Sequence, residues 1–257
     1  MDILIQIFNT ILYRPLFNIL VLFYEYLPLQ SLGLAIIVLT LLIKIVFYPL
    51  GVKTIQSQKK LSELQPKIKE IQEKYKNNKE QQAKELMDLY KKEKINPFSG
   101  CLLILIQLPV LIALYQIFWQ GLTEKQMTLL YSFISKPETV NTIFLKVIDL
   151  SKTAFIENNG IRYYLWGNIA LIILVGIVQF LQIKLATPST VNKKFTKDEK
   201  LNFSYQLQKQ TQYFMPIFVI FILFKLPAAV GLYWLITNLF TIFQQYFIIR
   251  KKKEENK

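Results

Sequence analysis

Long apolar runs recur along the chain and are separated by polar, charge-rich segments. A helix needs about 20 mostly apolar residues to cross the hydrocarbon core of a bilayer, and most of the runs come close to that length. The pattern therefore predicts an all-α polytopic membrane protein. The expected transmembrane helices are residues 32–52, 100–120, 166–183, 211–224 and 228–249.

The N-terminal segment, residues 1–27, is also apolar, but we expect Arg14-Pro15 to interrupt it and to leave halves too short to span. Its polar side chains, from Asp2 to Arg14, fall near one helical face. This pattern favours a helix that lies in the membrane interface. A sixth true span is the alternative, and it would leave the orientation of every later segment unchanged. A signal peptide is not expected, because the segment has neither a basic start nor a small-residue cleavage site.

A charged segment, residues 57–94, carries two apolar stripes at helical spacing. Leu61, Leu64, Ile68, Ile71 and Tyr75 form the first stripe, and Ala83, Leu86, Met87 and Tyr90 form the second. Asn77-Asn78 separates the stripes, so the segment is predicted to be an antiparallel helical hairpin. Pro66 is expected at the start of its first helix. A solvated charged linker is the alternative, which the stripes disfavour.

The net charge of +14 arises from 31 basic and 17 acidic residues, and its distribution predicts the topology. Residues 53–94 hold 12 of the Lys and Arg side chains, 184–209 hold six, and 250–257 hold five, whereas 121–164 hold five. Cytoplasmic loops of membrane proteins carry the excess of Lys and Arg. We therefore expect an N-terminus outside, a C-terminus in the cytoplasm and a mixed outer loop over 121–164. Binding to DNA is not expected.

Several classes of chemistry are disfavoured by the residues that the chain lacks. It has no His and one Cys, Cys101, so a disulfide framework, a His/Cys metal site and His-based acid–base catalysis are not expected. The predicted spans contain no Asp or Glu, which disfavours a proton relay. A phosphate-binding GxxxxGK[ST] loop is also missing. We expect neither an enzyme nor a cofactor.

Lys44 is the most informative single residue, because it lies inside the predicted span 32–52 without an acidic partner in any span. On a straight helix it would lie about 12 Å from the cytoplasmic end of the span. A lone cation in hydrocarbon is costly. It persists only if water reaches it or if something from outside the chain neutralises it. Snorkelling toward the interface is the alternative, and it relieves only part of that cost.

Polar residues recur in four of the predicted spans, several of them at a similar depth to Lys44. Ordinary hydrogen bonding between helices explains any single amide or hydroxyl, at about 0.6 kcal/mol per contact. Together with the cation, however, they predict a hydrated basic groove that opens to the cytoplasm. The candidate groove residues are Thr40, Lys44, Gln107, Gln179, Gln182, Tyr233, Trp234, Asn238 and Thr241.

Four segments carry a resemblance to a known family: residues 39–76, 85–118, 180–187 and 213–250. They contain the stretches LQPK, NPxxG and GLYW…N…QQ, which are specific in combination. On these residues the chain resembles the YidC/Oxa/Alb family of membrane protein insertases, in its bacterial YidC type. The segments cover the conserved five-span core of the family, in the order of the family.

The resemblance implies a fold in which five transmembrane helices surround a hydrophilic groove that is open to the cytoplasm and the lipid. An N-terminal interfacial helix and a cytoplasmic helical hairpin belong to the same fold. We expect one membrane domain over residues 1–250, a basic tail over 251–257 and no large periplasmic domain. The family usually has Arg at the position of Lys44. The charge is kept here, but the bidentate geometry of a guanidinium is lost.

The function implied is the insertion of nascent membrane proteins into a bacterial inner (plasma) membrane without any cofactor. The expected partners are nascent membrane proteins, the ribosome at the cytoplasmic loops and basic tail, and anionic lipids, while a role beside the Sec translocon stays open. Two other functions also stay open. One is a small anion channel or carrier with a site at Lys44, and the other is an assembly factor that holds clients without inserting them.

Overall fold

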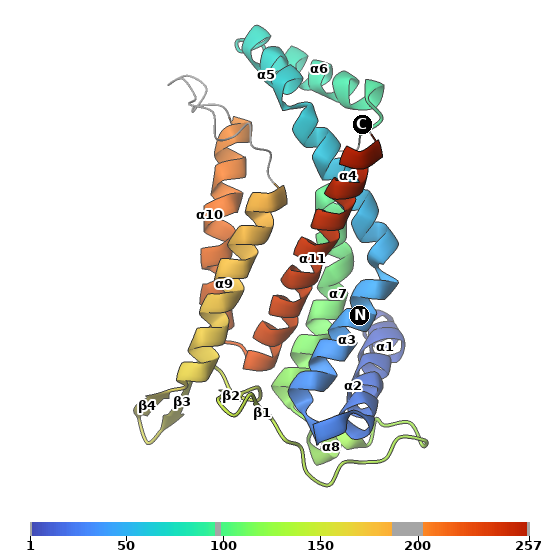
Figure 1. Cartoon of the computed structure of the whole chain (residues 1–257), viewed down its shortest axis with the longest axis vertical. Coiled ribbons are helices and arrows are strands. Elements are labelled where there is room, and N and C mark those ends of the chain that lie inside the picture. The colour runs from blue at the N-terminus through green and yellow to red at the C-terminus, as the bar shows by residue number, and fades with distance from the viewer. Residues whose placement is uncertain (1, 96–98, 187–202, 256–257) are drawn as a thin grey trace.

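The computed structural model describes residues 2–95, 99–186 and 203–255, which form an elongated helical bundle (Figure 1). The N-terminal helical run comprises α1 (Asp2–Phe8), the π-helical η1 (Asn9–Tyr13) and α2 (Arg14–Tyr26), and the 3-10 turn η2 (Pro28–Gln30) follows. The next helices are α3 (Leu32–Val46), α4 (Tyr48–Glu63), α5 (Gln65–Lys74), α6 (Lys79–Lys92), α7 (Ser99–Gln120) and α8 (Glu124–Met127). Strands β1 (Ile143–Phe144), β2 (Ile148–Asp149), β3 (Phe155–Asn158) and β4 (Ile161–Tyr164) precede α9 (Trp166–Ala186), α10 (Phe203–Leu223) and α11 (Ala228–Glu255).

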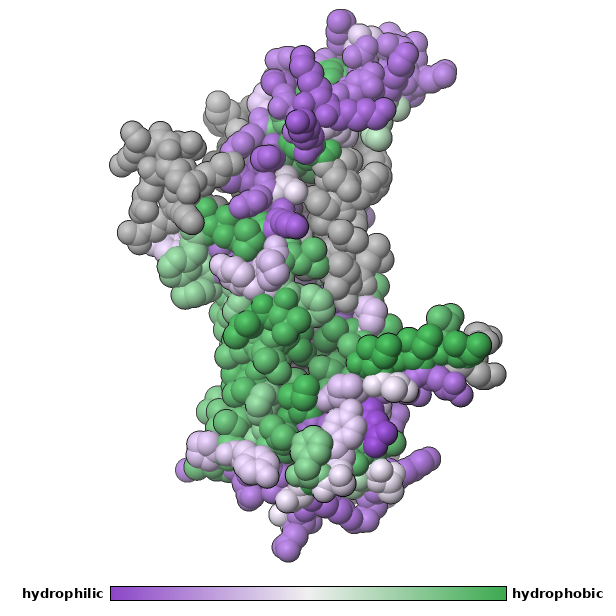
Figure 2. All heavy atoms as spheres, turned by 90° about the vertical axis from the view of Figure 1, so that its right-hand side faces the viewer, coloured by the Kyte–Doolittle hydropathy of each residue, from purple (hydrophilic) through white to green (hydrophobic). Residues whose placement is uncertain are grey.

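The prediction of a mostly helical membrane protein is confirmed. Within the described part of the chain, Ile3–Tyr26 and Trp166–Leu185 are each long and apolar enough to cross a membrane. The bent pair Leu32–Val46 and Tyr48–Leu61 counts as a third candidate if it is one span. Figure 2 shows the matching surface, with a hydrophobic middle region between two hydrophilic ends. The number of five spans stays a prediction.

The expected interruption at Arg14-Pro15 is wrong, because the helix runs through it from Asp2 to Tyr26. Pro15 lies in the first turn of α2, next to the wider π-helical turn of η1, where a missing amide hydrogen is tolerated. Arg14 is also held from outside the helix. Its Nε donates to the carbonyl of Leu129 at 3.0 Å, and its guanidinium lies 5.0 Å from the ring centre of Tyr131.

The predicted span 32–52 contains a bend of 66° between α3 and α4, and it remains a candidate span if this bent pair crosses the membrane as one. Pro49 explains the break: it has no amide hydrogen for the carbonyl of Ile45, and its ring would clash with that carbonyl in a straight helix. The bend falls at Phe47, which ends α3. The depth estimate for Lys44 assumed a straight helix and no longer holds.

The connection between α7 and α9 differs from the all-α expectation, because it contains two small antiparallel hairpins, β1–β2 and β3–β4. Asn168 on α9 organises this loop. Its Nδ2 donates to the carbonyls of Asp149, Lys152 and Thr153 at 2.9, 3.1 and 2.8 Å, and its Oδ1 accepts from the amide of Asp149 at 3.0 Å. Gly167 permits the close approach, since a Cβ there would lie 1.9 Å from the carbonyl oxygen of Val147.

Helices α5 and α6 form an antiparallel pair at the opposite end of the bundle (Figure 1). Tyr75 donates to the Oε1 of Glu85 at 3.3 Å, and Lys67 pairs with Glu93 at 2.7 Å. The Lys67 ammonium lowers the pKa of the Glu93 carboxyl through a hydrogen bond and through charge attraction. Asn78 caps α6 by accepting from the amide of Gln81. Asn96-Pro97 of the NPxxG stretch, most of the loop 184–209 and the last two residues of the tail lie outside the described residues.

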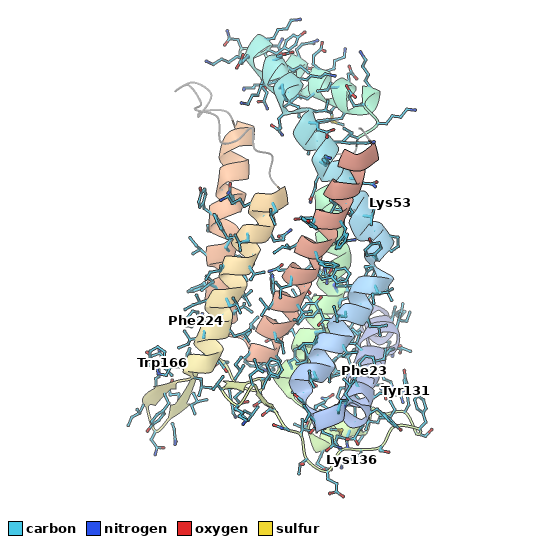
Figure 3. The ribbon with its side chains drawn as sticks, viewed as in Figure 1. Phe23, Lys53, Tyr131, Lys136, Trp166 and Phe224 are labelled. Carbon is cyan, nitrogen blue, oxygen red and sulfur yellow. The ribbon has the colours of Figure 1, made fainter. Side chains whose placement is uncertain are left out.

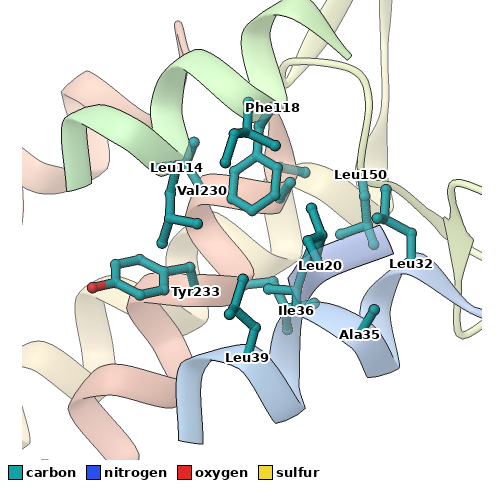
Figure 4. Packing of buried hydrophobic residues seen from close by; sticks show 14 of the residues in the cluster. Leu20, Leu32, Ala35, Ile36, Leu39, Leu114, Phe118, Leu150, Val230 and Tyr233 are labelled. Atoms are coloured by element: carbon teal, nitrogen blue, oxygen red, sulfur yellow. The ribbon is translucent and has the colours of Figure 1, made fainter. Parts of the chain in front are cut away.

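The apolar core lies between α2, α3, α7, α9 and α11, and α11 packs against both α9 and α3. Figure 4 shows side chains from α3, α7 and α11 meeting in one cluster, with the ring of Tyr233 at its edge. Leu20, Ile36, Leu39, Leu114 and Val230 are almost completely buried there. The hydroxyl of Tyr233 points away from the cluster, toward the polar region described next.

Asn168→Ala should destabilise the fold by about 3 kcal/mol, because it removes the four hydrogen bonds by which α9 holds this loop. SDS-induced unfolding in mixed micelles measures the loss. Asn158→Ala, which truncates an exposed asparagine on β3, is the matched control and should change little. An equal effect of the two substitutions would mean that Asn168 does not hold the loop.

Candidate functional site

A cavity of about 250 Å³ lies between α3, α7, α9 and α11. Polar side chains from all four helices line it, together with two leucines of α7. The lining residues are Lys44, Gln107, Leu108, Leu111, Gln182, Tyr233, Trp234, Thr237, Asn238 and Thr241. Helical periodicity explains the share of α11, whose residues 233, 234, 237, 238 and 241 repeat every three or four positions and so face one side.

Lys44 supplies the positive charge of the cavity. Its side chain lies in the last turn of α3 and is only 8% exposed. Its Nζ donates to the Oγ1 of Thr241 at 3.4 Å, a long contact to a neutral group. That hydroxyl is itself tied to its own helix, since it donates to the carbonyl of Thr237 at 2.8 Å. The lining residues that the structure describes include no carboxylate, so the charge of Lys44 is left available to an anion from outside the cavity.

Gln107 and Tyr233 join α7 to α11 across the cavity. The Nε2 of Gln107 donates to the hydroxyl of Tyr233. Tyr233 is 3% exposed, so this bond fixes a polar group at the boundary between the cavity and the apolar core. The hydroxyl thereby marks the point where the polar lining ends.

The structure brings seven of the nine predicted groove residues into the cavity lining: Lys44, Gln107, Gln182, Tyr233, Trp234, Asn238 and Thr241. Thr40 is not among them: it is 1% exposed, and its hydroxyl donates to the carbonyl of Ile36 in its own helix at 2.6 Å. Gln179 is not among them either, although it is 8% exposed and its Oε1 finds no hydrogen-bond partner within the described part of the chain. Thr237 was missed, although its position four residues after Tyr233 places it on the same helical face.

A polar contact connects α11 to the start of α4, just beyond the bend. Gln244 is 6% exposed, and its Nε2 donates to the carbonyl of Tyr48 at 3.1 Å. Gly51 makes room for this amide, since a Cβ at Gly51 would lie 2.8 Å from the Oε1 of Gln244. The ring of Tyr48 meets Phe240 edge-on, with centroids 6.4 Å apart. These contacts hold the start of α4 against α11, just beyond the end of α3.

Exposed apolar side chains flank the cavity on α7. Leu108 is 41% exposed and also lines the cavity, while Ile112, one residue after the lining residue Leu111, is 45% exposed. Leu239 and Phe243 on α11 are 45% and 62% exposed, but helical periodicity places them on the side of α11 away from its lining residues. A polar, positively charged interior therefore borders directly on surface that suits lipid or another apolar segment.

The chemistry available to this site is recognition rather than bond making. Amides and hydroxyls of the lining can exchange hydrogen bonds with a polar chain, and Lys44 can attract an anion. Among the described residues, no group of three or more His, Cys, Asp or Glu side chains is placed to hold a metal ion. The site therefore fits a polar, acidic segment of a partner better than a small reactive substrate.

Gly51→Ala should displace the amide of Gln244 and remove its bond to Tyr48, at a cost of about 1 kcal/mol in unfolding free energy. In a Gln244→Ala background the same change should cost almost nothing, because the displaced group is gone. A double-mutant cycle in SDS-induced unfolding measures the difference. Additive effects of the two substitutions would contradict this contact.

Comparisons with known proteins agree with this architecture. Residues 22–256 match the family model described as 60Kd inner membrane protein. The chain is 34% identical over 241 residues to the membrane protein insertase YidC of Syntrophobacter fumaroxidans, covering 94% of this chain and 38% of that protein. It is 34% identical over 242 residues to the YidC of Lawsonia intracellularis, covering 39% of that protein. It is also 32% identical over 225 residues to the YidC of Francisella tularensis subsp. novicida, covering 34% of that protein. The chain thus spans well under half the length of these relatives.

Proposed function

We propose, because this chain belongs to the 60Kd inner membrane protein family, that it is a membrane protein insertase. The relatives bear that name but are much longer, so the activity is proposed here from the residues that this chain has. The observation that carries the proposal is the cavity: a buried Lys44 among neutral polar groups, bordered by exposed apolar side chains.

The proposed arrangement in the membrane has five spans, 32–52, 100–120, 166–183, 211–224 and 228–249, in one domain over residues 1–250. The protein would lie in a bacterial inner membrane with its N-terminus outside and its C-terminus in the cytoplasm. The distribution of Lys and Arg supports this topology. The hairpin α5–α6 and the tail 251–257 would then face the cytoplasm. The exposed apolar side chains of α1, such as Ile3, Leu4 and Ile7, support an interfacial position for the N-terminal helix.

In the proposed mechanism, Lys44 attracts acidic residues of a short polar tail or loop of a nascent membrane protein. The attraction is stronger in the cavity than in bulk water, because the effective dielectric constant is lower. The amides and hydroxyls of Gln107, Gln182 and Asn238 would replace part of the hydration of the tail. The tail would thus leave the cytoplasm without crossing the full thickness of hydrocarbon.

The apolar segment of the same client would follow the exposed side chains of α7 into the lipid. Transfer of a largely apolar helix into the bilayer is favourable by tenths of a kcal/mol for each residue such as Leu or Ile. That transfer supplies the driving force, so the proposed reaction needs neither a cofactor nor covalent chemistry. Insertion by the purified protein would distinguish this function from holding clients, and ion flux in client-free liposomes would favour a channel.

Lys44→Ala should impair the insertion of clients with acidic tails and spare strongly apolar clients with neutral tails, because only the former use the charge. Lys44→Glu should be worse than Lys44→Ala for acidic tails, through like-charge repulsion, and Lys44→Arg should be tolerated. Lys44→Ala should also fold at least as well as the wild type, because a buried cation is removed. The measurement is insertion yield into proteoliposomes for paired clients that differ only in tail charge.

Lys53→Ala is the matched control for this series. Lys53 is exposed on α4, outside the cavity lining (Figure 3), so its loss removes the same charge from the protein without emptying the site. Insertion of acidic-tailed clients at wild-type yield by both Lys44→Ala and Lys44→Glu would rule out the mechanism.

The basic loop 184–209 and the tail 250–257 are proposed to contact the ribosome or anionic lipid. Contacts to phosphate release counterions, so ribosome binding should weaken steeply as salt rises. Removal of residues 250–257, which hold five Lys and Arg residues, should reduce ribosome co-sedimentation and flatten its dependence on salt. Unchanged co-sedimentation across the salt series would leave the tail as a topology signal only.

A further inference from the structure

The hairpin β3–β4 has two chemically different faces. Cross-strand partners share a face and neighbouring residues alternate. Phe155 pairs with Tyr164 and Glu157 pairs with Arg162, which places these four residues on one face. Charged contacts gather there: Arg162 lies 3.5 Å from the carboxylate of Glu157 and 5.1 Å from the ring centre of Phe155.

The other face of the hairpin is mainly apolar and is not covered. Ile156 pairs with Tyr163, and Ile161 pairs with Asn158. Ile156, Ile161 and Tyr163 are 39%, 57% and 50% exposed. A two-stranded hairpin alone is only marginally stable in water. An apolar face of this kind therefore needs a covering surface.

The position of the hairpin identifies that surface. Leu165 alone separates β4 from α9, whose Trp166–Leu185 segment is a candidate membrane span. In Figure 1 the hairpin projects sideways from the foot of α9, away from the bundle, and Figure 3 shows Trp166 at the same place. Trp166 is 75% exposed. Trp and Tyr are enriched where hydrocarbon meets the lipid head groups.

The exposed apolar surface also continues from the hairpin along α9. Ile173, Leu174 and Ile177 are 48%, 46% and 53% exposed and lie further into the same candidate span. If α9 crosses the membrane, lipid covers these side chains, and a protein partner on the hairpin would have to meet that lipid-covered surface. Because the apolar surface continues from the hairpin to α9, we favour lipid as the covering surface of both the hairpin and α9.

We propose that β3–β4 is a membrane-interface anchor. Its apolar face of Ile156, Ile161 and Tyr163 lies against the head-group region of the leaflet in which α9 begins. Its charged face, with Glu157 and Arg162, stays in water. The partner is the lipid surface itself, not a particular head group, because the face that is turned to it is uncharged.

The test uses a solvent-sensitive NBD label at single cysteines in a Cys101→Ser background, with the full chain in proteoliposomes. One variant carries the label at Ile161Cys and a second at Tyr163Cys, both on the apolar face. Glu157Cys, on the opposite face of the same hairpin, is the matched control. Lipids brominated on the acyl chains report contact with the bilayer, and iodide on both sides of the membrane reports contact with water.

Labels at positions 161 and 163 should show a blue-shifted emission, quenching by the brominated lipid and protection from iodide. The label at 157 should show the reverse. Equal iodide quenching at 161, 163 and 157 would overturn the anchor. Protection from iodide at 161 and 163 without quenching by brominated lipid would overturn it too, because it would show that protein covers this face. A positive result does not depend on insertion activity.

Discussion

The ammonium of Lys44 lies in an apolar bundle, where it makes a long contact to a neutral hydroxyl, and the arrangement around it reflects that constraint. Taking a charge out of water is costly unless it is paired or remains hydrated. Within residues 2–95, 99–186 and 203–255, no carboxylate lines the cavity, and neutral amides and hydroxyls take that place. Such groups can solvate a cation without neutralising it. The charge therefore persists at long range and can act on an anionic partner, which a salt bridge within the protein would prevent.

A hydrogen-bonded frame lies at the end of the bundle opposite to the hairpin α5–α6. Asn168 fixes the loop around Asp149 to α9, and the first amides of α11 donate to carbonyls of the same loop, from Ala228 to Lys152 at 2.8 Å and from Ala229 to Leu150 at 3.0 Å. The apolar cluster in Figure 4 fills the space between this frame and the cavity. Tyr233 belongs to both regions, with its ring in the cluster and its hydroxyl bonded to Gln107.

Much of the site could be predicted, because helical periodicity places polar residues of one helix on the same face. Positions 234, 238 and 241 recur on one face of α11, and Lys44 is conspicuous as a lone charge in an apolar run. Periodicity does not show which polar residues satisfy themselves within their own helix, as Thr40 does with the carbonyl of Ile36. Periodicity also does not show which part of a polar face reaches the cavity: Gln182 of α9 lines it, whereas Gln179 does not.

The fold was predictable to a similar extent, and its differences from the expected helices have identifiable physical causes. Apolar length locates the helices, but Pro has opposite effects at two sites. At Pro15 the π-helical turn and the contacts of Arg14 keep the helix continuous, whereas Pro49 breaks its helix. The difference lies in tertiary contacts that no pattern within the segment contains. The strands near Asp149 and Tyr164 are likewise too short to leave a periodic signal.

The bend at Phe47 has an electrostatic consequence for the cation beside it. Because α3 ends at Val46, Lys44 lies in the last turn of that helix and not in the middle of a longer one. The aligned peptide dipoles of a helix place about −0.5 of an elementary charge at its C-terminal end. That partial charge is fixed in the backbone and cannot be removed by protonation or displaced by a client. The bend that Pro49 imposes thus provides Lys44 with partial compensation of its charge, and leaves the rest of the charge to act on what enters the cavity.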